Sequence, residues 1–89
     1  MKAVVTVVGK DQVGIIAAVC NKLAEYNVNV LDISQTVMQG YFTMMMVVDI
    51  SAATLPLALL AQSMEDAGKE RSLSIRVQRE DIFEAMHRV

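Results

Sequence analysis

Apolar and polar residues repeat along the chain with two periods, one typical of strands and the other of helices. Residues 3–8 are β-branched and apolar on both faces, the pattern of a central strand covered on both sides. A turn is predicted next, built from Gly9, Lys10, Asp11 and Gln12. An amphipathic helix follows, whose apolar stripe is Ile16, Val19, Cys20 and Leu23. Asn27 lies where a left-handed residue would end this helix.

The next two runs predict a β-hairpin, because Gln39 and Gly40 separate them and Gly adopts the positive φ of a tight turn. Between Val28 and Met38 the alternation slips, which indicates a bulge near Val30. In the following strand one face carries Phe42, Met44, Met46, Val48 and Ile50. The opposite face carries Tyr41, Thr43, Met45, Val47 and Asp49. We expect the first of these faces to lie under helices.

A second helix is predicted with Thr54 as N-cap, Pro56 in its first turn and Gly68 at its end. Its apolar stripe is Leu57, Leu60, Ala61, Met64 and Ala67. A half-exposed fourth strand contains Leu73, Ile75 and Val77, and Asp81 begins a short helix with Ile82, Phe83 and Met86. Right-handed crossovers then place the first and third strands in the middle of the sheet. The predicted fold class is α+β, a ferredoxin-like βαββαβ sandwich in one domain, residues 1–89.

The composition of the chain indicates that it has a partner subunit. Hydrophobic residues make up 54% of the chain and charged residues 20%. A chain of this size buries only about 60 to 65% of its surface on folding, so we expect some apolar surface to face another chain. The segment after Lys2 is too short for a signal peptide, and no run approaches the roughly 20 apolar residues of a membrane helix. We therefore expect a cytoplasmic protein without a membrane partner.

Charge argues against nucleic acid as a partner. The formal net charge is −2, and the basic residues are scattered rather than gathered in a block. Gly40, Tyr41 and Phe42 lie where RNA-recognition domains of this topology carry stacking aromatics. Those domains also need aromatics on the exposed face of the first strand, where this chain offers Val and Thr. The RNA-binding alternative is therefore disfavoured.

Few residues could carry catalysis or bind a metal. The single His, His87, lies next to the C-terminus, and the single Cys, Cys20, lies on an apolar stripe, so no nucleophile has a base beside it. We interpret Cys20 as a small buried hydrophobe and His87 as a solvated tail residue. Carboxylates at strand ends (Asp11, Asp32 and Asp49) are more often caps than an acid–base pair. Consecutive methionines, Met44 to Met46, alternate between faces and cannot chelate together. We expect no catalytic residue, no metal and no cofactor.

The turn from Gly9 to Gly14 is the most informative segment for function. It leads directly into a helix, whose first N–H groups are unpaired and attract a carboxylate. Asp11 could cap the helix by accepting from the N–H of Val13 or Gly14, and Gly14 leaves room for a ligand. A tight, capped turn without any ligand is the alternative, and these residues alone do not separate the two.

The order of motifs along nearly the whole chain resembles an ACT domain. The resemblance rests on residues 9–16, on residues 23–36, on Tyr41 to Met46 and on residues 82–86. It is closer still to small stand-alone bacterial ACT proteins, whose relatives include the glycine cleavage transcriptional repressor and the N-terminal region of formyltetrahydrofolate deformylase. ACT domains are βαββαβ modules that regulate amino-acid metabolism. The resemblance therefore implies a regulatory protein rather than an enzyme.

The resemblance also implies where a ligand would bind. Family members bind a small molecule, often an amino acid, between the first turn of one subunit and the second strand of its partner. Carried onto this chain, the site comprises Asp11, Gln12, Val13, Gly14 and Ile15, with Asn29, Val30, Leu31 and Asp32 opposite. Gln12 and Val13 replace the basic residue and the proline that are frequent in this turn. The leading hypothesis is a homodimer that binds an amino acid and signals to another protein. The alternative is a protein-interaction module that uses the exposed edge of the second strand.

Overall fold

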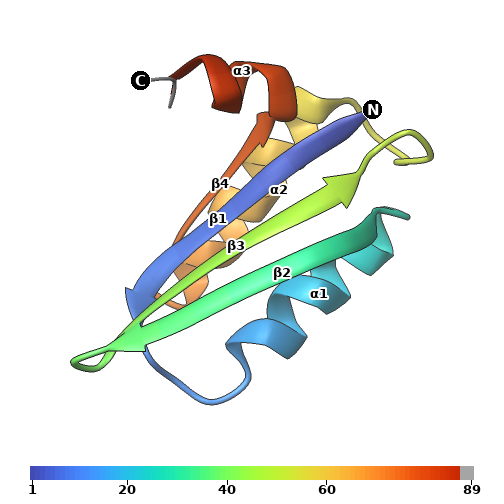
Figure 1. Ribbon diagram of the computed structural model, residues 1–89. Coiled ribbons are helices and arrows are strands. Elements are labelled where there is room, and N and C mark those ends of the chain that lie inside the picture. Colours follow the sequence, from blue (N-terminus) through green and yellow to red (C-terminus); the bar gives the residue numbers. More distant parts are fainter. Residues whose placement is uncertain (87–89) are drawn as a thin grey trace.

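A four-stranded antiparallel sheet with helices against one face is the architecture of the computed structural model, which describes residues 1–86 (Figure 1). The sheet order is β2-β3-β1-β4, so β1 and β3 are central, as predicted, and β2 and β4 are edges. His87 lies outside the described residues. The elements are β1 (Lys2–Lys10), α1 (Ile15–Glu25), β2 (Asn29–Met38), β3 (Tyr41–Asp49), α2 (Leu57–Glu70), β4 (Ser74–Arg79) and α3 (Glu80–Met86). The predicted ferredoxin-like βαββαβ fold with a short terminal helix is confirmed.

The core lies between the sheet and the helices, on alternate residues of each strand. Its fully buried members include Val5 and Val7 of β1, Met44 and Met46 of β3, Leu60 and Met64 of α2. Met45 points the other way and is 41% exposed, which confirms that the three methionines do not gather. In β2, Val30 pairs with Val48 and Asp32 pairs with Val47, so Leu31 is the extra residue of the predicted bulge.

The first helix differs from the prediction in its buried face. Ile15 is 2% exposed and Ile16 is 36% exposed, so the buried stripe is Ile15, Val19 and Leu23 rather than one containing Ile16. The helix begins directly after Gly14, which has a left-handed φ of 86°, so Ile15 is its first residue and the first member of the buried stripe. Cys20 is only half-buried, although it packs against the core as predicted.

The second helix differs at both ends. Its N-cap is Pro56 rather than Thr54, and no side chain caps it. The carbonyl of Pro56 accepts from the N–H groups of Leu59 and Leu60, while the N–H of Thr54 donates to the carbonyl of Tyr26. Gly68 does not end the helix, which continues to Glu70. A Cβ at Gly68 would lie 2.8 Å from the carbonyl oxygen of Leu73, so this glycine permits β4 to approach α2.

The predicted connections after α1 and between β2 and β3 are confirmed, whereas the turn after β1 begins later than predicted. Asn27 has a φ of 59° after α1, and Gln39 and Gly40 both have positive φ in the hairpin between β2 and β3. Gly9 and Lys10 were expected in the turn, yet they extend β1 by pairing with Phe42 and Tyr41. The turn itself is therefore shorter and runs from residue 11 to residue 14.

Candidate functional site

The turn between β1 and α1 is held by its backbone and leaves the start of the helix open. The N–H of Asp11 donates to the carbonyl of Gly40 over 2.8 Å, so the turn is fixed to the tip of the β2–β3 hairpin. No side-chain hydrogen bond caps α1, which corrects the expectation that Asp11 does so. The first N–H groups of the helix, from Ile15 onward, therefore remain available to an anion.

The side chains of the turn point in different directions. Val13 is 98% exposed, and Ile15 is buried, so only the backbone of Ile15 can face a ligand. A Cβ placed on Gly14 would find nothing within 4 Å, which means that the space next to the helix start is free. Gln12 donates from Nε2 to the carbonyl of Arg71 over 3.0 Å, which ties the turn to the C-terminal end of α2.

The other predicted half of the site, Asn29 to Asp32, lies at the start of β2. Asn29 pairs with Asp49, whereas the end of β2 pairs with Tyr41, beside the turn. A strand of ten residues spans about 30 Å, so within one chain the two halves are at opposite ends of the sheet (Figure 1). The structure therefore does not bring the two sets of residues together within a single subunit.

Within this second half, the bulge separates the residues by face. Val30 pairs with the buried Val48 and belongs to the helix side, whereas Asp32 pairs with Val47 and belongs to the uncovered face. Oδ1 of Asp32 accepts from the N–H of Ile33 over 2.9 Å, which fixes the carboxylate beside its own backbone. Leu31, at the bulge, is 47% exposed.

Comparison with known proteins identifies the family of the chain. The model of the ACT domain family matches residues 2–78. The chain belongs to the ACT domain family. An ACT domain protein from Streptococcus pneumoniae has the same fold, with a TM-score of 0.83 and 47% identity over 98% of each chain. A UPF0237 protein of Listeria innocua is 53% identical over the full length of both chains. ACT domains of this kind are small regulatory modules that generally bind amino acids and often dimerise.

The resemblance to deformylases is confirmed at the level of the fold. The formyltetrahydrofolate deformylase of Pseudomonas syringae superposes with a TM-score of 0.80 at 23% identity. The match covers 88% of this ACT domain but only 27% of the deformylase chain. The shared part is therefore one module of a larger protein.

The two edges of the ACT domain differ in a way that bears on assembly. The β2 edge carries exposed apolar side chains, namely Leu31, Ile33, Val37 and Met38, and its ten residues include no Lys, Arg or Pro. The β4 strand has six residues, two of which are Arg76 and Arg79. Natural proteins protect free edges with short strands and with charged residues. The β4 edge is protected in this way against another copy, and the β2 edge is not.

No charge cluster in the described residues suggests a metal or an acid–base pair. Between residues 1 and 86, no group of three His, Cys, Asp or Glu residues could hold an ion. Asp11 lies at the opposite end of the sheet from Asp32 and Asp49. Hydrogen bonds from the hydroxyl and the N–H of Ser51 hold the pKa of Asp49 below its ordinary value. Asp49 therefore acts as a structural acceptor at the end of β3.

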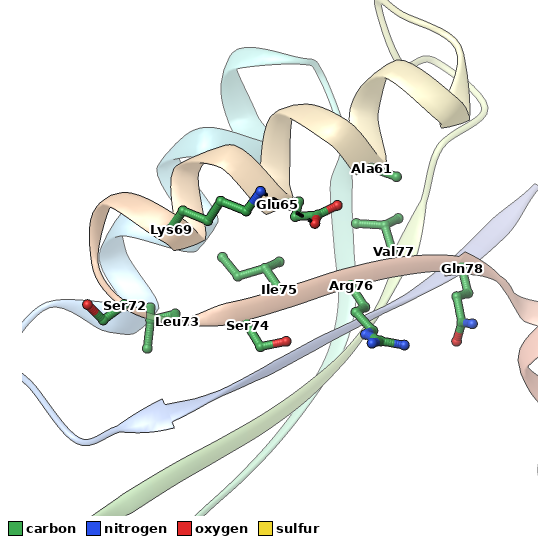
Figure 2. Close-up of a pocket in the computed structure, with 10 residues that line it drawn as sticks. All are labelled: Ala61, Glu65, Lys69, Ser72, Leu73, Ser74, Ile75, Arg76, Val77 and Gln78. Carbon is green, nitrogen blue, oxygen red and sulfur yellow. Dashed lines mark ion pairs between the residues drawn. The ribbon is translucent and has the colours of Figure 1, made fainter.

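One feature of the ACT domain was missed by the sequence prediction. A hollow of about 600 Å³ follows the free edge of β4 and is walled by α2 (Figure 2). Its charged residues are Glu65, Lys69 and Arg76. The i,i+4 spacing of Glu65 and Lys69 was visible in the sequence, but their position above an edge strand was not.

In the part of the chain that the structure describes, no helix is long and apolar enough to cross a bilayer.

Proposed function

We propose that this chain is a cytoplasmic homodimeric regulatory protein that binds an amino acid between its subunits and has no catalytic role. The observation that carries the proposal is the uncapped start of α1 after Gly14, which presents free N–H groups beside open space. Such a helix end is suited to a carboxylate, because the N–H groups and the helix dipole both favour negative charge. The N–H groups of Val13, Gly14 and Ile15 are the proposed donors.

The second half of the site comes from a symmetric dimer. When two copies of one edge strand pair antiparallel about a two-fold axis, the start of each strand lies beside the end of the other. For β2, this places the partner's Asn29 near Met38, at the end of the sheet where the hairpin holds the turn. The exposed apolar β2 edge supports this pairing, because its burial contributes favourable free energy. The dimer joins the two halves that one chain separates.

The partner's residues then contact the other end of the ligand. We assign the ammonium group to the side-chain oxygen of Asn29 and to backbone carbonyls beside Val30 and Leu31, at the bulge. Asp32 lies on the uncovered face, so its carboxylate attracts the ammonium group from around the edge of the sheet. Because each ligand contacts both subunits, ligand binding stabilises the dimer.

The test is a thermal-stability screen against the common amino acids, with two matched variants. Gly14→Leu fills the open space beside the helix start, and Gly40→Leu introduces the same residue at a similar φ, 82° against 86°, also without a clash. We expect one or a few amino acids to raise the Tm of the wild type and of the Gly40 variant, but not of the Gly14 variant.

The alternative function, a protein-interaction module that uses the β2 edge, is supported by the same exposed apolar residues. It predicts no Tm shift with any amino acid. A shift that persists in the Gly14→Leu variant would also refute the proposed position of the ligand, because the side chain of Leu occupies that space.

A further inference from the structure

The hollow beside β4 has the features of a groove for one more strand. β4 pairs with β1 on one side only, so every second residue directs its N–H and carbonyl groups outward from the sheet. Ile75 and Val77 point toward α2 and form an apolar floor with Ala61, whereas Arg76 points away from the helix (Figure 2). An extended segment at this edge would continue the sheet and lay alternate side chains on that floor.

The charges around the groove favour an acidic segment. Arg76 makes no ion pair within residues 1–86. Lys69 is paired with Glu65 of the same helix at 3.8 Å, but both side chains are more than half exposed, so the pair is weak and exchangeable. Two cations and one carboxylate therefore border the groove, in a protein whose overall charge is negative. A segment whose alternate carboxylates lie on the same face as Arg76 complements this cation, while its apolar residues face α2.

A second copy of the chain fits the same edge poorly. In a two-fold antiparallel pairing of β4 with itself, opposite residues must point to the same face, so Arg76 can face only Ser74, Arg76 or Gln78 of the other copy. In each of these registers the two Arg76 side chains are directly opposite or diagonal to one another. Like charges in such positions are destabilising, because the long Arg side chains reach one another in both the opposite and the diagonal arrangement.

We infer that the β4 edge and the facing side of α2 form a docking site for an extended acidic segment of a different protein, which adds a fifth strand to the sheet. The inference does not require the ligand site, because none of the groove residues belongs to the turn or to β2. In a dimer formed through β2, both grooves remain accessible at the outer ends of the joined sheet.

The experiment is an NMR titration of the isotope-labelled chain with two synthetic peptides of about eight residues, blocked at both ends. One peptide alternates Glu with Val, and the other alternates Lys with Val. We expect the Glu peptide to shift the amides of residues 74–79 and to protect from exchange those that point away from β1, with further shifts around Ala61 and Lys69. We expect it to bind at least about fivefold more tightly than the Lys peptide, the factor that one exposed charge pair can supply.

Two variants with the same change of charge separate the groove from general electrostatics. Arg76→Glu alters the rim of the groove, and Lys2→Glu alters an exposed residue of β1 that lies outside it. We expect Arg76→Glu to abolish or reverse the preference between the peptides and Lys2→Glu to leave it. Equal binding of both peptides, shifts confined to β2, or no binding at millimolar peptide would overturn the inference. Self-association through β4 on concentrating the free protein would overturn it as well.

Discussion

The substitution Ile33→Lys tests the dimer in which the proposed ligand site depends on both subunits. Ile33 lies in the middle of β2 on the helix side and is 40% exposed in the single chain. Full burial of an Ile side chain contributes about 1.5 to 3 kcal/mol, so covering the remaining 40% contributes about 1 kcal/mol per subunit. A two-fold interface contains the residue twice, which gives about 2 kcal/mol, or roughly a 30-fold weaker dimer.

The inserted charge increases this loss, because Lys on an edge strand opposes pairing with another strand. Sedimentation across a dilution series measures the dissociation constant, and we expect it to rise by about 30-fold or more. Ile82→Lys is the matched control: Ile82 is 43% exposed on α3, away from β2, and the same substitution there should leave the dimer intact. The reasoning is refuted if both variants weaken the dimer equally, or if the wild type stays monomeric at high micromolar concentration.

Three further predictions concern stability and are checked by chemical or thermal unfolding. Leu60→Ala should cost about 2 to 5 kcal/mol because Leu60 is fully buried, whereas Leu57→Ala should cost less because Leu57 is half-buried; equal losses would contradict this assignment. Gly68→Ala should destabilise by about 1 to 3 kcal/mol despite the helix propensity of Ala, since its Cβ would meet the carbonyl of Leu73; a more stable variant would show that β4 can move away. The pKa of Asp49 is lower in the folded protein than its value of about 3.9 in the unfolded chain. Its ionised carboxylate therefore stabilises the fold above that value, and this contribution is lost as the pH falls through the lower folded pKa. Asp49→Asn should weaken the pH dependence of the free energy of unfolding below about pH 4.

The fold could be predicted from the sequence because the period of the apolar residues changes at each boundary. The alternation of β3 sends Met44 and Met46 into the core and Met45 to the other face, and the slipped alternation of β2 marks the bulge at Leu31. Such patterns depend only on the geometry of a strand. The hairpin at Gln39 and Gly40 was predictable for a similar reason, since a two-residue connection requires positive φ.

The errors at two glycines have a different cause, which is packing between elements. Gly68 reads as a helix end by local rules, yet it lies inside α2 because Leu73 and Ile75 pack against it. Gly9 reads as a turn residue, yet it stays in β1, where a Cβ would lie 2.5 Å from a side-chain carbon of Leu73. Leu73 is 64 positions from Gly9, and although it is only five positions from Gly68, it contacts that glycine because the chain reverses before β4. The groove at β4 was missed for the same reason.

The candidate site was predicted only in part. The turn before α1 follows from the sequence Gly-Lys-Asp-Gln-Val-Gly, but the role of Gln12 does not, because its partner Arg71 is 59 positions away. The separation of Asn29 from the turn also could not be read locally. It follows from the pairing of β2 with β3, which places Asn29 at the other end of the sheet, so the proposed site draws on residues of two subunits.

The hydrogen bond from Gln12 to the carbonyl of Arg71 joins the turn of the proposed ligand site to the segment beside the proposed groove. It connects the turn to the end of α2, two residues beyond Lys69, which borders the groove. If an amino acid at the turn changes the affinity of the groove by some factor, an acidic segment in the groove must change the affinity for the amino acid by the same factor. The direction of signalling would then depend on whether the amino acid or the acidic segment is more abundant. The same protein could report the amino-acid concentration to its partner, or the partner could change how tightly the protein binds the amino acid.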